Sequence, residues 1–461
     1  MSTPRPTPCL PGPYEFPRAT RFALSNGLRV IVAPMHRLPL VTVLAVVDAG
    51  AAGDVEGQEG LAMLAAGALA EGTAERDGPA LADAFERLGT AVESGADWDN
   101  ASIRLTVTPA RLDEALALLA EVLVTPRFAE PDVERLKAER LAELLQQQVE
   151  PRGLADERFA RVVYDASSRY AVSAGGTPHT VRGLDAAQVR AWHAARYGGA
   201  TTTIIVTGDV TPEQVQGMIE HHLGGWTHPV QPGRVVSATP RSETRAVHVV
   251  SKADAPQSEL RVGHVGLPRT HPDYFHAVVM NAVLGGLFSS RINLNLREVH
   301  AYTYGANSAF DWRRAAGPFV VASAVKTEVT ADAVREILTE IDRIRDAEIS
   351  ADELDLATKY LAGVFPIRYE TTGAVAAALA LANVHDLPDD YFSTYRQRVL
   401  AVSRADVLAA ARAHLRPAAL QVLAVGDEGA IKEPLAKLGV GVISVIGAED
   451  ADGRGQKADH P

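Results

Sequence analysis

Hydrophobic positions recur at helical spacing through residues 59–73, which read EGLAMLAAGALAEGT. One face of this segment has the i, i+3, i+4, i+7, i+8 spacing of a buried helix, formed by Leu61, Leu64, Ala65, Ala68 and Leu69. The opposite face carries no charge where a surface helix would be polar, and consists of Ala62, Met63, Ala66 and Gly67. Gly72 ends the pattern, as glycine commonly ends a helix. The segment predicts a helix with apolar surroundings on both sides.

Strands are predicted by a second kind of pattern. The segment ASIRLTV alternates, and its alternation directs Ile103, Leu105 and Val107 to one face of a sheet. Short apolar runs predict further strands: GLRVIVAP, LVTVLAVVDAG, RAVHVVS, ELRVGHVGLP and PFVVASAVK. Because several of these strands follow one another directly, we expect mostly antiparallel sheets with helices on one face, an α+β design. No Gly-x-Gly-x-x-Gly follows a strand, which disfavours a dinucleotide-binding fold.

The two parts of the chain resemble each other. Residues 184–209 and 402–427 both read as a capped helix, a turn and a strand closing on Gly-Asp, with an offset of 427 − 209 = 218. Helical patterns starting at Thr108 and Thr330 are offset by 330 − 108 = 222. An offset that drifts so little over this length indicates duplication of one domain.

Breaks in composition set the expected boundaries. Residues 1–17 form a Pro-rich extended arm, residues 227–245 a linker with three prolines, and residues 449–461 a polar, disordered tail. The two similar α/β domains are then expected at residues 18–226 and 246–448.

Charge and composition exclude several functions. The chain has 45 basic and 57 acidic side chains, a net charge of −12, which disfavours nucleic-acid binding. Cys9 is the single cysteine, so no intramolecular disulfide can form. No apolar run reaches the ~18 residues that would span a bilayer, and no secretory signal is visible. We expect a cytoplasmic protein, or a periplasmic one if a leader was removed.

The histidines do not suggest a metal site. His221 and His222 are adjacent on a predicted helix and point about 100° apart, so with nearby His228 we expect surface residues. His271 and His276 in THPDYFHAV would be turned roughly 140° from each other on a helix. No third ligand is visible beside them, and Thr-His-Pro-Asp reads as an ordinary helix start.

Residues 284–328 carry the most distinctive motif, beginning LGGLFSSRINLNLREVHAYTYGANSAF. This stretch resembles the C-terminal-domain signature of the pitrilysin-type zinc metallopeptidases, with Gly-Gly, Phe-Ser-Ser-Arg, Leu-Arg-Glu and a later tyrosine. Arg297 and Tyr304 keep the family spacing, 304 − 297 = 7. The resemblance covers nearly the whole chain and is strongest to the two-domain, processing-peptidase-like branch.

The resemblance also assigns the opening helix. Active members carry His-x-x-Glu-His between Gly-Leu-Ala and Gly-Thr, and both flanks are present here. The zinc histidines then fall on Met63 and Gly67, the catalytic glutamate on Ala66, and the third zinc ligand on Glu143. Methionine, alanine and glycine cannot hold zinc or activate water, and a lone carboxylate does not hold zinc tightly. We therefore expect no metal in this chain.

The resemblance implies a non-catalytic subunit of a heterodimeric zinc endopeptidase. Its zinc would lie in a homologous partner with an intact His-x-x-Glu-His, and its substrate would be an extended peptide. Arg297 and Tyr304 would complete the partner's active site, the tyrosine by donating to the oxyanion. From the residues alone, Arg297 could instead pair with an acidic side chain and Tyr304 could be a half-buried strand residue. The alternative function is a peptide-binding or scaffold pseudoenzyme with no role in hydrolysis.

Overall fold

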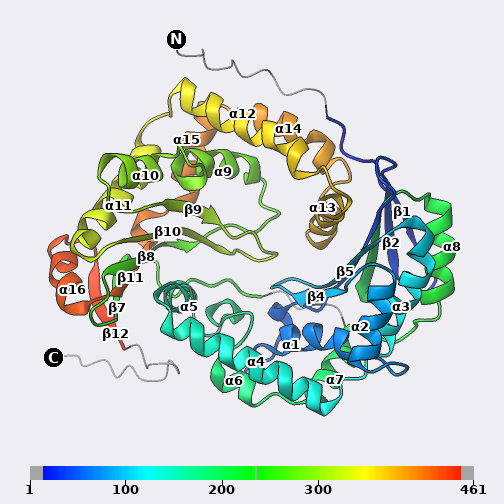
Figure 1. Cartoon of the computed structure of the whole chain (residues 1–461). Coiled ribbons are helices and arrows are strands. Elements are labelled where there is room, and N and C mark those ends of the chain that lie inside the picture. The colour runs from blue at the N-terminus through cyan, green and yellow to red at the C-terminus, as the bar shows by residue number, and fades with distance from the viewer. Residues whose placement is uncertain (1–13, 232, 234–235, 448–461) are drawn as a thin grey trace, which may run out of the picture.

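Two six-stranded sheets with their helices make up the protein, as shown in Figure 1. The computed structural model describes residues 14–231, 233 and 236–447. The expectations for residues 1–13 of the arm and for the tail at 449–461 lie outside the described residues. The residues described between 227 and 245 contain no helix or strand.

The first half contains strands β1–β6. The strands are β1 (Thr20–Ala23), β2 (Arg29–Pro34), β3 (Val41–Val47), β4 (Glu93–Ala96), β5 (Ala101–Val107) and β6 (Thr202–Gly208). The helices are α1 (Leu61–Ala68), α2 (Gly78–Arg87), α3 (Leu112–Val124), α4 (Glu130–Val149), α5 (Pro151–Val163), α6 (Pro178–Arg182), α7 (Ala186–Arg196) and α8 (Pro212–Leu223). The alternation predicted for β5 is confirmed, since Ile103, Leu105 and Val107 are buried in the first core.

The second half has a similar order, except that two strands rather than three precede its first α-helix and one strand follows its last. Its strands are β7 (Ala246–Ser251), β8 (Gln257–Val265), β9 (Ala306–Phe310), β10 (Pro318–Lys326), β11 (Gln421–Gly426) and β12 (Val442–Ile446). Its α-helices are α9 (Tyr274–Asn281), α10 (Arg291–Asn293), α11 (Thr330–Asp346), α12 (Ala351–Arg368), α13 (Thr372–Val384), α14 (Tyr391–Leu400), α15 (Arg404–His414) and α16 (Glu428–Lys437). Two π-helical turns, η6 (Ala282–Gly286) and η7 (Leu294–Val299), follow α9 and α10.

The strand orders confirm the mostly antiparallel α+β class and show one difference between the halves. The first sheet runs β1-β2-β6-β3-β5-β4 and the second runs β12-β7-β11-β8-β10-β9. Five strands correspond in order. The outermost strand does not: β1 precedes β2 and pairs antiparallel with it, whereas β12 comes from the end of the chain and pairs parallel with β7.

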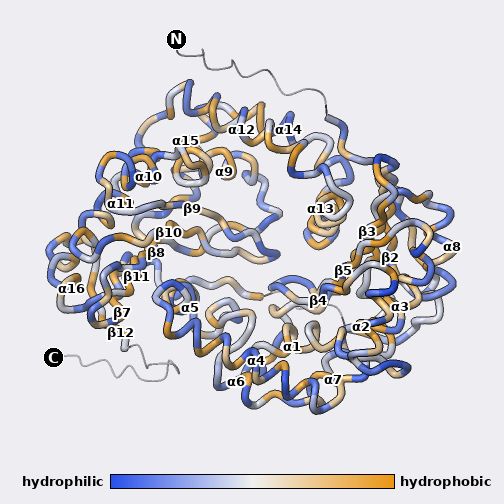
Figure 2. Tube along the Cα trace, viewed as in Figure 1, coloured by the Kyte–Doolittle hydropathy of each residue, from blue (hydrophilic) through white to orange (hydrophobic). Residues whose placement is uncertain are grey.

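Each sheet buries its second face under a helix from the other half. Helix α13 packs on β3 and β6 of the first sheet, and α5 packs on β8 and β11 of the second. Strands β3, β6 and β11 are buried along their whole length, because both faces of these strands are covered. In Figure 2, hydrophobic positions accordingly follow the strands of both sheets and helix α13.

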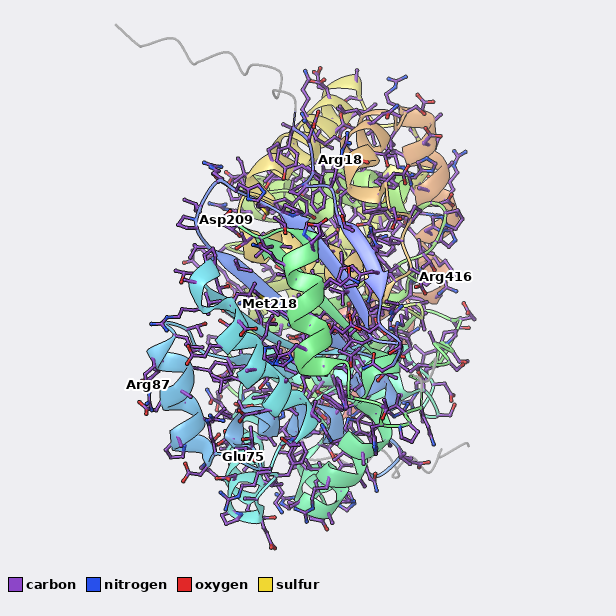
Figure 3. All side chains as sticks on the ribbon, turned by 90° about the vertical axis from the view of Figure 1, so that its right-hand side faces the viewer. Arg18, Glu75, Arg87, Asp209, Met218 and Arg416 are labelled. Carbon is purple, nitrogen blue, oxygen red and sulfur yellow. The ribbon has the colours of Figure 1, made fainter. Side chains whose placement is uncertain are left out.

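The start of the described chain also joins the two halves. The phenyl ring of Phe16 stacks on Phe392 with 4.7 Å between ring centroids, and the Tyr14 hydroxyl donates to the Tyr369 carbonyl at 2.9 Å. In Figure 3, Arg18 lies near the second half, while helix α8 with Met218 lies across the first sheet. Met218 packs against the first core.

One helical segment has the length and composition of a membrane span, although no uninterrupted apolar run in the sequence is that long. Tyr274–Val299 is apolar enough to cross a membrane, and 56% of its most apolar window is buried inside the protein. The side chains that it buries belong to the second core, among them Met280, Leu284, Ile292 and Leu296. The hydropathy of this segment is explained by packing in that core.

Candidate functional site

Helix α1 is held at its start by a buried carboxylate. The Asp54 carboxylate accepts hydrogen bonds from the backbone N–H groups of Gly60 and Ala62, both at 2.9 Å. Arg169 pairs with the same carboxylate at 3.0 Å. A carboxylate at a helix N-terminus satisfies free N–H groups and complements the helix dipole. The position of α1 is therefore well defined although it carries no catalytic side chain.

The four positions that correspond to the zinc site contain no set of metal ligands. Ala66 is completely buried, Met63 is partly buried, and a Cβ atom at Gly67 would meet nothing within 4 Å. Helix α4, which packs beside α1, carries Glu143. The Glu143 carboxylate is 62% exposed and pairs with Arg140 at 2.9 Å. A Cβ atom would therefore fit at position 67, but glycine supplies no ligand there.

The signature motif forms the segment from α9 to η7, and several of its residues serve to fix its shape. Arg291 makes a two-point ion pair with Glu353 of α12, at 2.6 Å and 3.0 Å. The Arg291 guanidinium lowers the pKa of Glu353 to about 2. Arg291 is thus engaged in holding the segment against α12.

Asn293 and Asn281 were not identified from the sequence, yet they connect this segment to β9. The Asn293 amide donates to the Phe288 carbonyl at 2.6 Å and accepts from the Ala306 N–H at 3.0 Å. Asn281 exchanges hydrogen bonds with Ser308, donating to its carbonyl at 2.9 Å and accepting from its hydroxyl at 2.7 Å. The sequence does carry a signal for both residues, since they are polar residues within an apolar helical segment. Buried amides require hydrogen-bond partners, so such positions indicate contacts with another element.

Arg297 lies on η7 with its guanidinium over the Phe288 ring, 4.5 Å from the ring centroid. Its closest acidic neighbour is Glu298, whose carboxylate lies 3.5 Å from the Arg297 Nε atom. Phe288 is 69% exposed. The aromatic ring orients the guanidinium, which remains accessible at the surface.

Tyr304 lies in the loop before β9 and is 92% exposed. It is therefore not a half-buried strand residue. The loop is held at both ends, because Asn293 binds the N–H of Ala306 and the Thr303 hydroxyl donates to the Ala324 carbonyl at 2.6 Å. A large aromatic side chain is thus presented to solvent from a fixed backbone.

The chain does not bring these two groups of residues together. Met63, Ala66, Gly67 and Glu143 belong to α1 and α4 at the bottom of Figure 1. Arg297 and Tyr304 adjoin α10 and β9 at the upper left. The elements that carry the two groups therefore lie apart in the chain.

A cavity of about 630 Å³ lies between the two halves. The edge strand β4, the Asp311–Arg313 turn of the second half and helix α13 contribute to its lining. Strand β4 ends its sheet, so its outer edge has no strand neighbour within the described chain. Arg314 joins the halves here, donating its backbone N–H to Asp99 at 2.9 Å and its guanidinium to Asp48 at 2.5 Å.

Comparison with known proteins identifies the family. Residues 29–169 match the family model described as "Insulinase (Peptidase family M16)", and residues 183–361 match "Peptidase M16 inactive domain". The chain belongs to the M16 family, the pitrilysin-type metallopeptidases. Because the ligand positions on α1 carry Met63, Ala66 and Gly67, it is a non-catalytic member.

Relatives and solved structures are similar over most of the chain. An "Uncharacterized zinc protease" of Mycobacterium leprae is 24% identical over 71% of this chain and 75% of its own length. A "Non-peptidase homolog YmxG" of Helicobacter pylori is 25% identical over 74% of this chain and 78% of its own length. A peptidase M16 inactive domain from Pseudomonas fluorescens has the same fold, with a TM-score of 0.83 at 24% identity over 89% of this chain and 98% of that one. A protease from Helicobacter pylori gives 0.84 at 18% identity over 90% and 100%.

Proposed function

We propose that this chain is the non-catalytic subunit of a heterodimeric M16 zinc endopeptidase. The partner subunit carries an intact His-x-x-Glu-His and the zinc ion, and the substrate is an extended peptide. Arg297 and Tyr304 of this chain complete the partner's active site. The observation that carries the proposal is that Tyr304 is 92% exposed on a loop whose backbone is fixed at both ends.

The chemistry of the two side chains supports this role. Hydrolysis of a peptide bond develops negative charge on the carbonyl oxygen, and a phenol O–H positioned there would stabilise it. A guanidinium binds peptide carbonyls or the same developing charge through its fixed set of donors. The Arg297 side chain is 36% exposed, and its Nε atom lies 3.5 Å from the Glu298 carboxylate, which supports a guanidinium accessible to a substrate.

Substitution of Tyr304 in the complex tests the proposal. Tyr304→Phe removes one donor and keeps the ring, so turnover by the assembled complex should fall about 10²–10³-fold, or about 3–4 kcal/mol in the barrier. Arg297→Ala should also slow hydrolysis, with part of the loss in KM if it holds ground-state carbonyls. Tyr360→Phe is the matched control, because Tyr360 is a 53% exposed tyrosine on α12. Unchanged turnover for Tyr304→Phe in a well-formed complex would contradict the proposal.

The cavity beside β4 favours a second candidate function, peptide binding without hydrolysis. An extended peptide can add to the free edge of a sheet through backbone hydrogen bonds. In that case the chain alone should bind an unstructured fluorescent peptide, measured by anisotropy, and should leave the turnover of any active homologue unchanged. Stimulation of the partner's turnover separates the first proposal from this one.

A further inference from the structure

The start of α9 and the end of α15 bring together side chains that commonly bind metals. These are His271, Asp273 and His414, whose ligand atoms all lie within 4.8 Å of one another. Across residues 14–231, 233 and 236–447, no second group of three or more His, Cys, Asp or Glu side chains is as close. The sequence showed no third ligand near His271, and the fold supplies one in His414, 141 positions after Asp273.

The local structure fixes the three side chains in one place. His271 and Asp273 share a tight turn, in which the Asp273 backbone N–H donates to His271 Nδ1 at 3.1 Å. His414 is the last residue of α15, which packs along α9. Its Nε2 atom lies 2.7 Å from Asp273 Oδ2, and its ring centroid lies 4.9 Å from that of His271.

The donor set matches the chemistry of a divalent transition metal. Two imidazoles and one carboxylate are common protein ligands of zinc, whereas calcium and magnesium prefer oxygen alone. Ligand atoms around a tetrahedral zinc lie about 3.3 Å apart, given bonds of about 2.0 Å. The three ligand atoms, all within 4.8 Å of one another, would have to move closer together to reach this spacing.

The surroundings leave room for the remaining coordination. The His414 side chain is 10% exposed and that of Asp273 is 40% exposed, so protein encloses one side and water reaches the other. His276, on α9, has its Nδ1 atom 3.8 Å from Asp273 Oδ1 and adds a third imidazole beside the carboxylate. Water or His276 can therefore complete the coordination of an ion.

We propose that His271, Asp273 and His414 bind one zinc ion, which joins the start of α9 to the end of α15. The ion belongs to the second half of the chain and is separate from the Met63, Ala66 and Gly67 positions. Because α9 leads directly into the segment with Arg297, the ion stabilises the base of that segment. This proposal departs from the expectation of no metal only for the second half of the chain; Met63, Ala66 and Gly67 still offer no zinc site on α1.

Zinc titration of the full chain tests this inference without a partner or a peptide. Tag-free protein is treated with chelator, dialysed and titrated with zinc by calorimetry, and its Tm is measured with and without zinc. We expect one equivalent of zinc per chain and a higher Tm when zinc is present. Cobalt in place of zinc should give a visible absorption band with the intensity of a tetrahedral or five-coordinate site.

Three variants locate the ion. His271→Ala and His414→Ala should each abolish the binding of one zinc equivalent and the rise in Tm. Circular dichroism shows whether each variant is folded, and one folded variant is enough for the test. His222→Ala is the matched control, since His222 forms a histidine–aspartate pair with Asp113 at 2.9 Å that belongs to no group of three close ligands among the residues that the structure describes. It should bind zinc as the unchanged chain does.

Two results would overturn the inference. One is a chain that binds no zinc and shows no change in Tm. The other is zinc binding that persists in both His271→Ala and His414→Ala, which would place the ion elsewhere. Neither result bears on Tyr304, because no hydrolysis is measured.

Discussion

At the scale of single residues, the environment of a side chain determines its role more than its type does. Arg291 and Arg297 are six positions apart in the same motif. Arg291 is 17% exposed and locked to Glu353, whereas Arg297 is 36% exposed and rests on an aromatic ring. The first arginine holds the structure together, and the second is accessible to a substrate.

Asp99 makes stability depend on pH at the contact between the halves. Burial, with a smaller contribution from neighbouring Asp97, raises the pKa of Asp99 to about 6, although the Arg314 N–H partly opposes this rise. The folded state then binds a proton more tightly than the unfolded state does. The contribution of this group to stability is therefore fully present below about pH 4 and is lost as pH rises through 6.

Asp99→Asn should remove this dependence, because the amide oxygen still accepts from Arg314 but does not ionise. We compare the free energy of unfolding of the variant with that of the unchanged protein. Their difference should shift in favour of the variant between pH 4 and pH 7, by at most about 2–3 kcal/mol. Urea unfolding at several pH values measures the difference. A difference that stays constant over this range would show that Asp99 does not titrate there.

At the scale of elements, the segment from α9 to η7 depends on a few buried amides. Asn293 is 4% exposed, and its amide binds the Phe288 carbonyl and the Ala306 N–H. Apolar packing of Ile292 and Leu296 keeps the segment in the core, while Asn293 determines the path of the loop that carries Tyr304.

Asn293→Ala should destabilise the protein by about 1–3 kcal/mol, because buried polar groups lose their partner. It should also lower turnover in the complex, since the loop with Tyr304 is no longer held at Ala306. Asn307→Ala, at an exposed position of neighbouring β9, serves as the control and should change neither quantity. Equal effects of the two substitutions would show that Asn293 does not position the loop.

At the scale of the whole molecule, the exchange of α5 and α13 makes the two halves depend on each other. Helix α13 covers Ile31, Leu44 and Ile205 of the first sheet with Val375, Ala376 and Leu379. The first sheet would expose these apolar residues without the second half, so we expect the chain to unfold in one cooperative transition.

Leu379→Ala should lower the stability of both halves together, by about 2–5 kcal/mol, through loss of buried contacts and creation of a cavity. Leu379 is 3% exposed, whereas Leu381 on the same helix is 40% exposed. Leu381→Ala should therefore cost within about 0.5 kcal/mol. Chemical denaturation measures the stability of both variants. Two separate unfolding transitions, of which Leu379→Ala shifts only one, would show that the two halves do not depend on each other.

The sequence by itself determined the elements and the identity of the motifs. Periodicity reports which face of an element is buried, and so it predicted β5 and the buried face of α1 correctly. The spacing of Arg297 and Tyr304 and the flanks of residues 63–67 led to the family, because motif spacing is local information.

Only the tertiary structure decided which distant residues meet. Periodicity shows that β3 is apolar on both faces, but it does not show that α13 covers one of them. In the same way, the sequence places His271 near Asp273, but only the packing of α15 on α9 brings His414 beside them. Such contacts depend on how whole elements pack, and residues far apart in the chain carry no mutual pattern in a single sequence.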